Sequence, residues 1–204
     1  MAVALVVFPM MVSNAWQVFR MGEFTKALRD YWIFAAALMS VLWLTTSVTA
    51  AISQDALIAM VGIVIVVFAV TSLAVKPPPL PDRYDQVGQA LAGTAAGVLG
   101  GLTAIWSPPM VTYLIARGLD KDEFVRASGL LILLGSLPLC IGFWQTGLLN
   151  GANAPVSAAM IVPTLLGFSL GEVLRRRLKA DRFRVILLLV FLVMGLNLIR
   201  KAFL

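Results

Sequence analysis

The sequence predicts an all-α polytopic membrane protein, with about seven membrane segments in two inverted repeats and a broken Gly/Pro helix hairpin in the second repeat. Three observations lead to this fold class. The chain has 204 residues, of which 60% are hydrophobic and only 13% are charged. Several apolar runs reach a length of about 20 residues, which spans a bilayer as a helix. The charged residues fall mostly in short loops between these runs.

One proline-rich linker divides the chain into two halves. Residues 76–87 contain the run KPPPLPDRYDQ. This run is stiff and extended, because each proline fixes its own backbone and disfavours helix in the residue before it. Residues 1–75 form the first half, an incomplete repeat of three spans. Residues 88–204 form the second half, in which a broken hairpin precedes three further spans.

The apolar runs define the membrane segments in chain order. The first run contains Pro9 and is followed by a charged loop, whereas the second and third runs are joined by a tight connection, Ser53-Gln54-Asp55. The run after the hairpin contains Pro138. The predicted segments are residues 2–19, 31–52, 56–75, 88–118, 124–149, 155–174 and 185–199.

The segment at 88–118 does not have the pattern of one ordinary membrane helix. Gly93, Gly97 and Gly101 recur every four residues, so they share one helical face and let a second helix approach closely. Pro108 and Pro109 then interrupt the run, which predicts a helix, a break and a half-helix. In transporters, broken helices of this kind mark the substrate site. The structural alternative is a proline-kinked helix held by packing alone.

The basic residues predict which loops share one side of the membrane. They lie in residues 20–30, 76–87, 117–126 and 175–184, whereas residues 53–55 and 150–154 carry none. All the basic loops fit the cytoplasmic side if the hairpin leaves the membrane on the face where it entered. The hairpin is therefore predicted to be re-entrant, or to be two helices that return. Either arrangement makes the two halves an inverted repeat. Arg200 and Lys201 then lie outside, against the charge rule.

An anion site is favoured over a cation site, because almost every acid and base lies in a loop. The N-terminus of a half-helix offers free N–H groups and a positive dipole end. Ser107 stands where a capping residue would sit, Pro109 suits the first turn, and the N–H groups of Met110 to Thr112 would bind the anion. The alternative is that Ser107 caps its own helix. The predicted substrate-binding residues here are Thr103, Trp106, Ser107, Pro108, Pro109 and Met110.

Two Trp-Gln pairs form a second group of candidate substrate-binding residues. Trp16 and Gln17, with Asn14 nearby, follow a proline-containing apolar run, and so do Trp144 and Gln145. An amide in lipid without a partner is costly, so both glutamines are expected to face protein, water or headgroups. One interpretation is that they line a translocation path. The other is that they belong to an interfacial belt of tryptophans and amides.

The composition argues against several classes of function. The absence of histidine argues against a transition-metal site, and a single cysteine, Cys140, excludes an intrachain disulfide. No cofactor is expected, and no nucleophile–base pair or paired carboxylates indicate an enzyme. The net charge of +6 lies in loops, where it indicates topology and not a nucleic acid partner. The predicted partners are a small anionic substrate and the lipid bilayer, and the small-residue faces would allow a homodimer.

Four stretches resemble the TauE/SafE family of sulfite exporters. GVLGGLTAIWSPPMVTYLIARGLDKDEFVRAS is similar to the family's Gly-rich helix, proline break and following loop. LPLCIGFWQTGLL is similar to the next span, and FPMMVSNAWQVFR is similar to its counterpart in the first half. LLGFSLGEVLRRRL, followed by LVFLVMGLNLI, resembles the C-terminal pair of spans. Together these stretches cover most of the chain.

The resemblance implies a permease of the bacterial inner membrane that exports a small anion such as sulfite, a sulfonate or a related organic acid. Two features depart from the family pattern. Family members usually carry a first Gly-rich segment ahead of the position of Met1, and Trp106 stands in a break that is often richer in glycine. The first departure leaves a second hypothesis: a non-transporting membrane subunit, or a truncated relative that keeps the fold.

Overall fold

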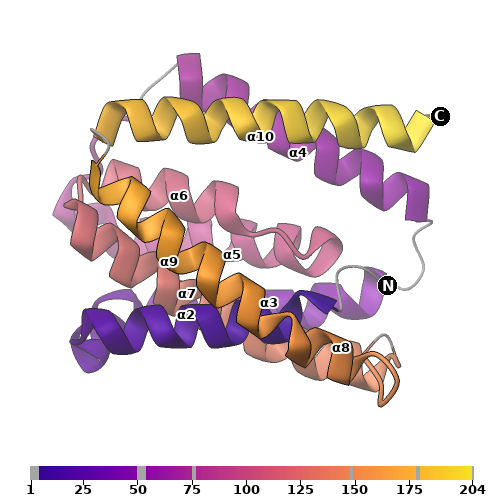
Figure 1. The fold of residues 1–204 in the computed structure, drawn as a ribbon. Coiled ribbons are helices and arrows are strands. Elements are labelled where there is room, and N and C mark those ends of the chain that lie inside the picture. The colour runs from indigo at the N-terminus through magenta and orange to yellow at the C-terminus, as the bar shows by residue number, and fades with distance from the viewer. Residues whose placement is uncertain (1–4, 50–53, 75–76, 148, 178–179, 204) are drawn as a thin grey trace.

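The computed structural model describes residues 5–49, 54–74, 77–147, 149–177 and 180–203. These residues form helices joined by turns and short loops, with no strand among them (Figure 1). The predicted all-α fold class is therefore confirmed. In chain order the elements are α2 (Val7–Met21), α3 (Phe24–Thr49), α4 (Gln54–Ala74), the 3₁₀ turn η1 (Asp82–Tyr84), α5 (Asp85–Thr103), α6 (Ser107–Ala116), α7 (Lys121–Gln145), α8 (Ala154–Ala159), α9 (Ile161–Arg177) and α10 (Ala180–Phe203).

The described helices have the length and composition of a polytopic membrane protein. Three of the described segments are long and apolar enough to cross a bilayer: Phe24–Thr46, Lys121–Gln145 and Ala154–Gly171. Shorter apolar segments, Ala59–Ser72 and Leu188–Arg200, lie in α4 and α10. Each predicted membrane segment thus corresponds to one helix or to a pair of consecutive helices.

Two predicted spans differ in detail from the helices. The span predicted from residue 31 belongs to a helix that begins earlier, at Phe24, because the residues before Tyr31 include good helix formers such as lysine, alanine and leucine. The chain bends instead at a kink, where Tyr31 has φ −119° and ψ 18°. The span predicted over residues 155–174 is divided into α8 and α9. Pro163 lacks the N–H that would bond to the carbonyl of Ala159, so the helix is interrupted there.

α5 lies against α3 through the predicted small-residue face. A Cβ added at Gly93 would lie 2.7 Å from the carbonyl oxygen of Phe34, and one at Gly97 would lie 2.7 Å from Cβ of Val41. The hydroxyl of Thr45 donates a 3.1 Å hydrogen bond to the carbonyl of Gly97. Gly101 also packs directly on Thr45. The four-residue glycine spacing therefore serves a close helix–helix contact, as small residues do in membranes.

The hairpin of α5 and α6 leaves the bundle at the end where it entered. The backbone N–H of Leu80, just before α5, donates a 2.8 Å hydrogen bond to the carbonyl of Ala116 at the end of α6. Arg117 then forms ion pairs with Asp82 and Asp85 across the same end. α6 has 10 residues, or about 15 Å of helix, which is half of a bilayer core. The prediction that the hairpin returns to the end where it entered is confirmed.

The basic loops that the structure describes gather at one end of the bundle. Arg126 at the start of α7 forms a 2.6 Å ion pair with Glu23, which lies between α2 and α3. This pair lies at the end of the bundle where the two ends of the hairpin are joined. At the opposite end, the hydroxyl of Ser157 in α8 donates to the carbonyl of Leu5, which Pro9 leaves without its helical partner. The loops after α2 and after α7 therefore face opposite ends, as an inverted repeat requires. The division into halves at residues 76–87 stays a prediction.

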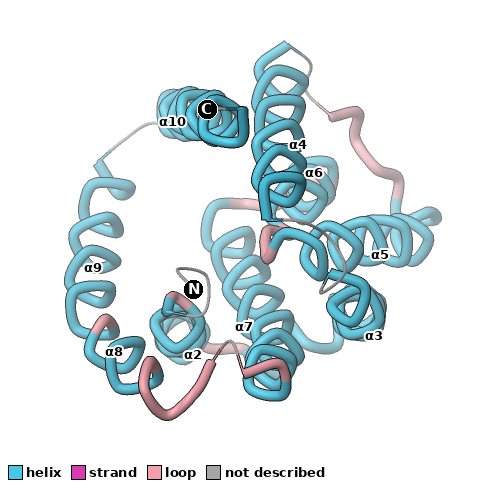
Figure 2. Tube along the Cα trace, turned by 90° about the vertical axis from the view of Figure 1, so that its right-hand side faces the viewer, coloured by secondary structure: helices cyan, strands magenta, loops and turns pink. Residues whose placement is uncertain are grey.

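α4 and α10 form a pair along one side of the bundle (Figures 1 and 2). They meet at facing glycines, because a Cβ added at Gly62 would lie 3.0 Å from the carbonyl oxygen of Gly195. The rings of Phe68 and Phe191 lie 6.3 Å apart on the same interface. α4 also borders the hairpin, so it forms one wall of the space beside α5 and α6.

Candidate functional site

The break in the hairpin lies between two well-defined helix ends. α5 ends at Thr103, and Ala104 follows with φ 57°, the left-handed conformation that commonly terminates a helix. α6 begins at Ser107, and Trp106 occupies the capping position. The predicted register, with Ser107 as the cap, is therefore wrong by one residue. A tryptophan stands in the cap, and both prolines lie in the first turn, where their missing N–H groups break no helical hydrogen bond.

This register changes the set of backbone donors. In an α-helix capped by Trp106, the N–H of Met110 already bonds to the carbonyl of Trp106. The prediction that the N–H groups of Met110 to Thr112 are free is therefore wrong. Pro108 and Pro109 have no N–H at all. The backbone donors that remain at the start of α6 are those of Trp106 and Ser107.

Two hydroxyl groups flank the break, and they differ in what they bond. The hydroxyl of Thr103 donates a 2.6 Å hydrogen bond to the carbonyl of Leu99 and accepts a 3.2 Å hydrogen bond from the N–H of Ile105. These two bonds close the end of α5. The hydroxyl of Ser107 forms no hydrogen bond with any described residue, and the helix cap has no side-chain hydrogen bond. The alternative that Ser107 caps its own helix is therefore wrong. Ser107 keeps a donor for another molecule.

The indole of Trp106 fills a slot between two glycines. Its side chain is only 2% exposed. A Cβ added at Gly100 on α5 would lie 3.1 Å from Cε3 of the indole, and one at Gly135 on α7 would lie 3.1 Å from Cε2. Gly135 stands near the middle of the 25-residue helix α7, so Trp106 lies at about mid-membrane depth.

The N–H of this buried indole has no hydrogen-bond partner. Trp106 Nε1 is fully enclosed and bonds to no described group. A buried polar group without a partner costs about 1–3 kcal/mol, so native proteins rarely leave one unused. The Trp106 Nε1–H and the Ser107 hydroxyl are thus two donors without a described acceptor, in adjacent residues at the start of α6. Such donors suit a ligand that carries hydrogen-bond acceptors.

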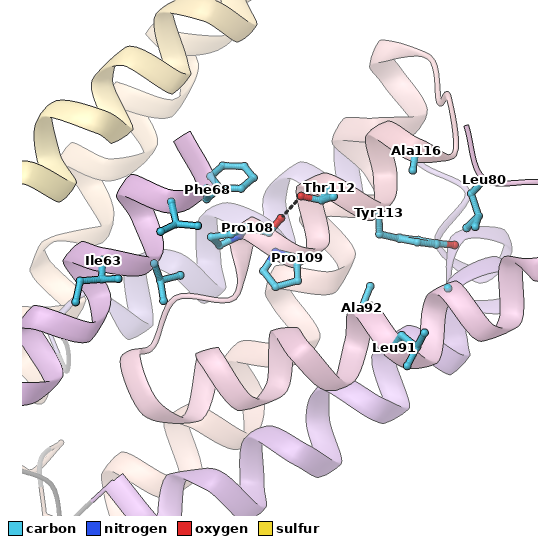
Figure 3. Close-up of a pocket in the computed structure, with 13 residues that line it drawn as sticks. Ile63, Phe68, Leu80, Leu91, Ala92, Pro108, Pro109, Thr112, Tyr113 and Ala116 are labelled. Atoms are coloured by element: carbon cyan, nitrogen blue, oxygen red, sulfur yellow. Dashed lines mark hydrogen bonds between the residues drawn. The ribbon is translucent and has the colours of Figure 1, made fainter. Parts of the chain in front are cut away.

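The remaining predicted residues of this group are apolar walls. Pro108 and Met110 are buried, and Pro109 is half-buried. Pro108 and Pro109 also line a groove of about 630 Å³ between the hairpin and α4 (Figure 3). The hydroxyl of Thr112 in that groove already donates to the carbonyl of Pro108 at 2.9 Å. The groove is therefore a hydrocarbon surface and offers an anion nothing.

The two Trp-Gln pairs do not form one site. Gln17 donates to the carbonyl of Val125 near the start of α7, whereas Trp144 and Gln145 stand at the end of α7. Trp144 follows Val125 by 19 positions, which makes about 28 Å of helix between them. The two pairs therefore lie at opposite ends of the bundle. An inverted repeat has this consequence, since it exchanges the two sides.

Their individual contacts favour the interfacial interpretation. Trp16, Trp144 and Gln145 are exposed, as residues of a tryptophan belt are. The amide nitrogen of Asn14 donates 2.8 Å to the carbonyl of Met10 on its own helix. Gln17 packs on Gly129 and joins α2 to α7. Nothing in these contacts brings Asn14 or Gln17 to the break in the hairpin.

A polar cluster that sequence reasoning missed holds the hairpin at its open end. One oxygen of Asp85, Oδ1, accepts 2.7 Å from the phenol of Tyr113 and lies 3.0 Å from Nε of Arg117. The other oxygen, Oδ2, accepts 2.9 Å from the amide of Gln89. The hydrogen bond to Asp82 raises the pKa of Arg117 above its ordinary value. The start of α5 and the end of α6 are thus joined through one carboxylate.

A second polar group lies beside this cluster, between α3 and α7. The phenol of Tyr31 donates 3.4 Å to Glu123, and its ring stands edge-on to Tyr113 with the centroids 6.5 Å apart. Tyr113 and Arg117 are four residues apart at the end of a half-helix, and Asp85 directly follows the linker. That spacing, on two segments predicted to return to one face, was the signal available in the sequence.

The described residues contain no group of three or more histidine, cysteine, aspartate or glutamate side chains that could hold a metal ion.

In a comparison with protein families, the model for the sulfite exporter TauE/SafE matches residues 1–198. A comparison with curated proteins and a comparison with solved structures gave no match.

Proposed function

Because the chain belongs to the sulfite exporter TauE/SafE family, we propose that it exports a small anion, such as sulfite, a sulfonate or a related organic acid, across the bacterial inner membrane. We place the binding site for that anion at the start of α6. The observation that carries this proposal is the enclosed Nε1–H of Trp106, a donor at mid-membrane depth without an acceptor.

The donors around Trp106 suit an oxyanion. Sulfite and sulfonates carry several acceptor oxygens, and hydrogen bonds to a charged acceptor are about twice as strong as neutral ones. The indole N–H, the Ser107 hydroxyl and the Ser107 N–H would surround such a group. The positive end of the α6 dipole adds to the attraction. The neighbouring Thr103 contributes indirectly, since its hydroxyl fixes the end of α5.

The lack of basic side chains around the break suits a site that must release its anion. Residues 103–110 contain no lysine or arginine. A transported ion must bind strongly enough to enter a site and weakly enough to leave it. Neutral donors in a re-entrant break meet that requirement without a cation that would hold the anion. The second hypothesis, a non-transporting subunit that keeps the fold, gives the enclosed indole donor no role.

The proposal is tested by uptake of labelled sulfite into proteoliposomes, with sulfonates and short carboxylates as competitors. We expect saturable uptake by the unmodified chain. Trp106→Phe keeps an aromatic ring but removes the donor, so the KM should rise about tenfold or more. Trp144→Phe, at an exposed position at the end of α7, is the matched control and should leave the KM unchanged.

Each outcome decides between the hypotheses. No saturable flux of any competitor anion from folded, reconstituted protein would favour the non-transporting subunit. Saturable flux with equal KM values for the unmodified chain and Trp106→Phe would keep the transporter but remove this site.

A further inference from the structure

A groove lies between α4 and the hairpin of α5 and α6 (Figure 3). α4 forms one wall, α5 forms the floor, and α6 forms the other wall. Its volume of about 630 Å³ is within the range of about 300–1,000 Å³ that is usual for small-molecule sites. The lining residues are Ile63, Val64, Val67, Phe68, Leu80, Gly88, Leu91, Ala92, Pro108, Pro109, Thr112, Tyr113 and Ala116.

The polar side chains of this lining are already bonded. The phenol of Tyr113 donates to Asp85, and the hydroxyl of Thr112 donates to the carbonyl of Pro108. Small-molecule sites use a few free polar groups to orient their ligands. Because both hydroxyl groups are occupied, the groove favours an occupant that makes no hydrogen bonds. A hydrocarbon chain meets this condition.

The groove has the length of one leaflet. Along α6 the groove extends from Ala116, where the two ends of the hairpin are joined, to Pro108 near the break. These two residues are eight positions apart, which corresponds to about 12 Å along the helix. One leaflet contributes about 15 Å, half of the roughly 30 Å hydrocarbon core. An acyl chain that enters beside Ala116 would therefore reach the prolines at the start of α6.

The groove opens on the outer surface of the bundle. Ile63 and Val67 on α4 and Leu91 on α5 are each at least half exposed. In a membrane protein such a surface faces lipid, so an acyl chain reaches the groove directly from the bilayer. A polar occupant would have to cross hydrocarbon to arrive there.

A cation without a salt-bridge partner among the described residues follows the lining residue Leu80 in the chain. Arg83 follows Leu80 by three residues, is exposed, and lies 4.5 Å over the ring of Tyr84. No carboxylate of the described residues forms a salt bridge with Arg83, whereas Arg117 is held by Asp82 and Asp85. The predicted topology puts this end at the cytoplasmic leaflet, where anionic lipids attract basic residues next to the membrane.

We propose that this groove binds one anionic phospholipid, with an acyl chain along α6 and the headgroup at Arg83. The acyl chain would lie against Pro108 and Pro109 at the start of α6. The lipid thereby supports the half-helix whose N-terminus we assign to the anion. This lipid site does not depend on which anion is transported, or on whether transport occurs.

The test is native mass spectrometry of the purified protein after exchange with phosphatidylglycerol or phosphatidylcholine of identical acyl chains. We expect phosphatidylglycerol to be retained in preference to phosphatidylcholine. Ala92→Phe fills the floor of the groove and should abolish the retained lipid. Ala95→Phe, at an exposed position of α5 outside the groove, is the matched control and should retain it.

Charge is tested separately from shape. Arg83→Gln should lower the preference for phosphatidylglycerol about fivefold, whereas Lys121→Gln, an exposed lysine at the start of α7, should not. Equal retention in Ala92→Phe and Ala95→Phe would overturn the site. Retention without a headgroup preference would overturn the anionic phospholipid as its occupant. Thermal unfolding of each variant shows whether any loss of lipid comes from loss of fold.

Discussion

The side-chain carbonyl of Gln89 accepts a 3.2 Å hydrogen bond from the backbone N–H of Phe34. In a regular helix that N–H would donate to the carbonyl of Asp30. The chain departs from helical geometry at Tyr31, and the amide nitrogen of Gln89 donates 2.8 Å to the Asp30 carbonyl instead. One side chain of α5 thus bonds to both backbone groups at the kink in α3. It fixes the hairpin to the first half of the chain.

Gln89→Leu should destabilise the protein more than any single exposed substitution. It keeps the volume of the side chain but leaves the Phe34 N–H and the Asp30 carbonyl without this partner in a buried place. Each such loss costs about 1–3 kcal/mol. Thermal unfolding in detergent measures the effect, with Gln145→Leu at the exposed end of α7 as the control. Similar unfolding temperatures for the two variants would show that the kink needs no amide.

Asp85 and Asp82 should differ, although both pair with Arg117. The side chain of Asp85 is 22% exposed and has three partners, whereas that of Asp82 is 96% exposed and bonds only to Arg117. Exposed ion pairs contribute little to stability. Asp85→Asn should therefore lower the unfolding temperature clearly, and Asp82→Asn should barely change it. A larger effect at Asp82 would contradict the central place of Asp85 in this polar cluster.

Gly97→Ala and Gly167→Ala should have opposite effects. A Cβ at Gly97 would lie 2.7 Å from Cβ of Val41 and 3.0 Å from the carbonyl oxygen of Leu38, so α5 must move away from α3. Such overpacking costs about 1–3 kcal/mol. A Cβ at Gly167 on α9 meets no atom within 4 Å. There alanine should be neutral or stabilising, since it favours helix over glycine. Equal losses of folded protein would contradict the contact between α3 and α5.

Ser107→Ala and Thr103→Val should separate binding from structure. Ser107 keeps a hydroxyl that bonds to no described residue, so its loss should raise the KM for sulfite without changing the unfolding temperature. Thr103 bonds to Leu99 and Ile105, so its loss should lower the unfolding temperature. Transport kinetics and unfolding of the two variants check both statements. A Ser107→Ala variant that transports like the unmodified chain would remove Ser107 from the site.

The sequence predicted the frame of the fold well, because membrane insertion leaves strong marks on composition. Glycines spaced by four predicted the face of α5 that contacts α3. Basic loops predicted that the hairpin returns to one side, and Arg117 beside Asp82 confirms it. These features depend on neighbours in the chain or on the bilayer, and both can be inferred from residue types.

The contacts between distant segments could not be inferred in the same way. The register of α6 was misjudged because tryptophan is not a usual cap, and an ordinary capping residue, Ser107, directly follows it. Asp85 lies in the predicted linker, and its partner Tyr113 lies 28 positions away, so the local sequence does not indicate their contact. The two Trp-Gln pairs look alike in sequence, but the inverted repeat carries them to opposite ends. Similarity along the chain therefore did not mean proximity in the fold.

The most direct test of the central claim is nuclear magnetic resonance of the indole N–H groups in protein labelled with nitrogen-15 tryptophan and placed in nanodiscs. The chain has five tryptophans, and Trp106→Phe assigns the resonance of interest. We predict that sulfite shifts the Trp106 indole resonance saturably and leaves the other four unchanged. A Trp106 resonance that stays in place while the same preparation transports sulfite would contradict the proposed site.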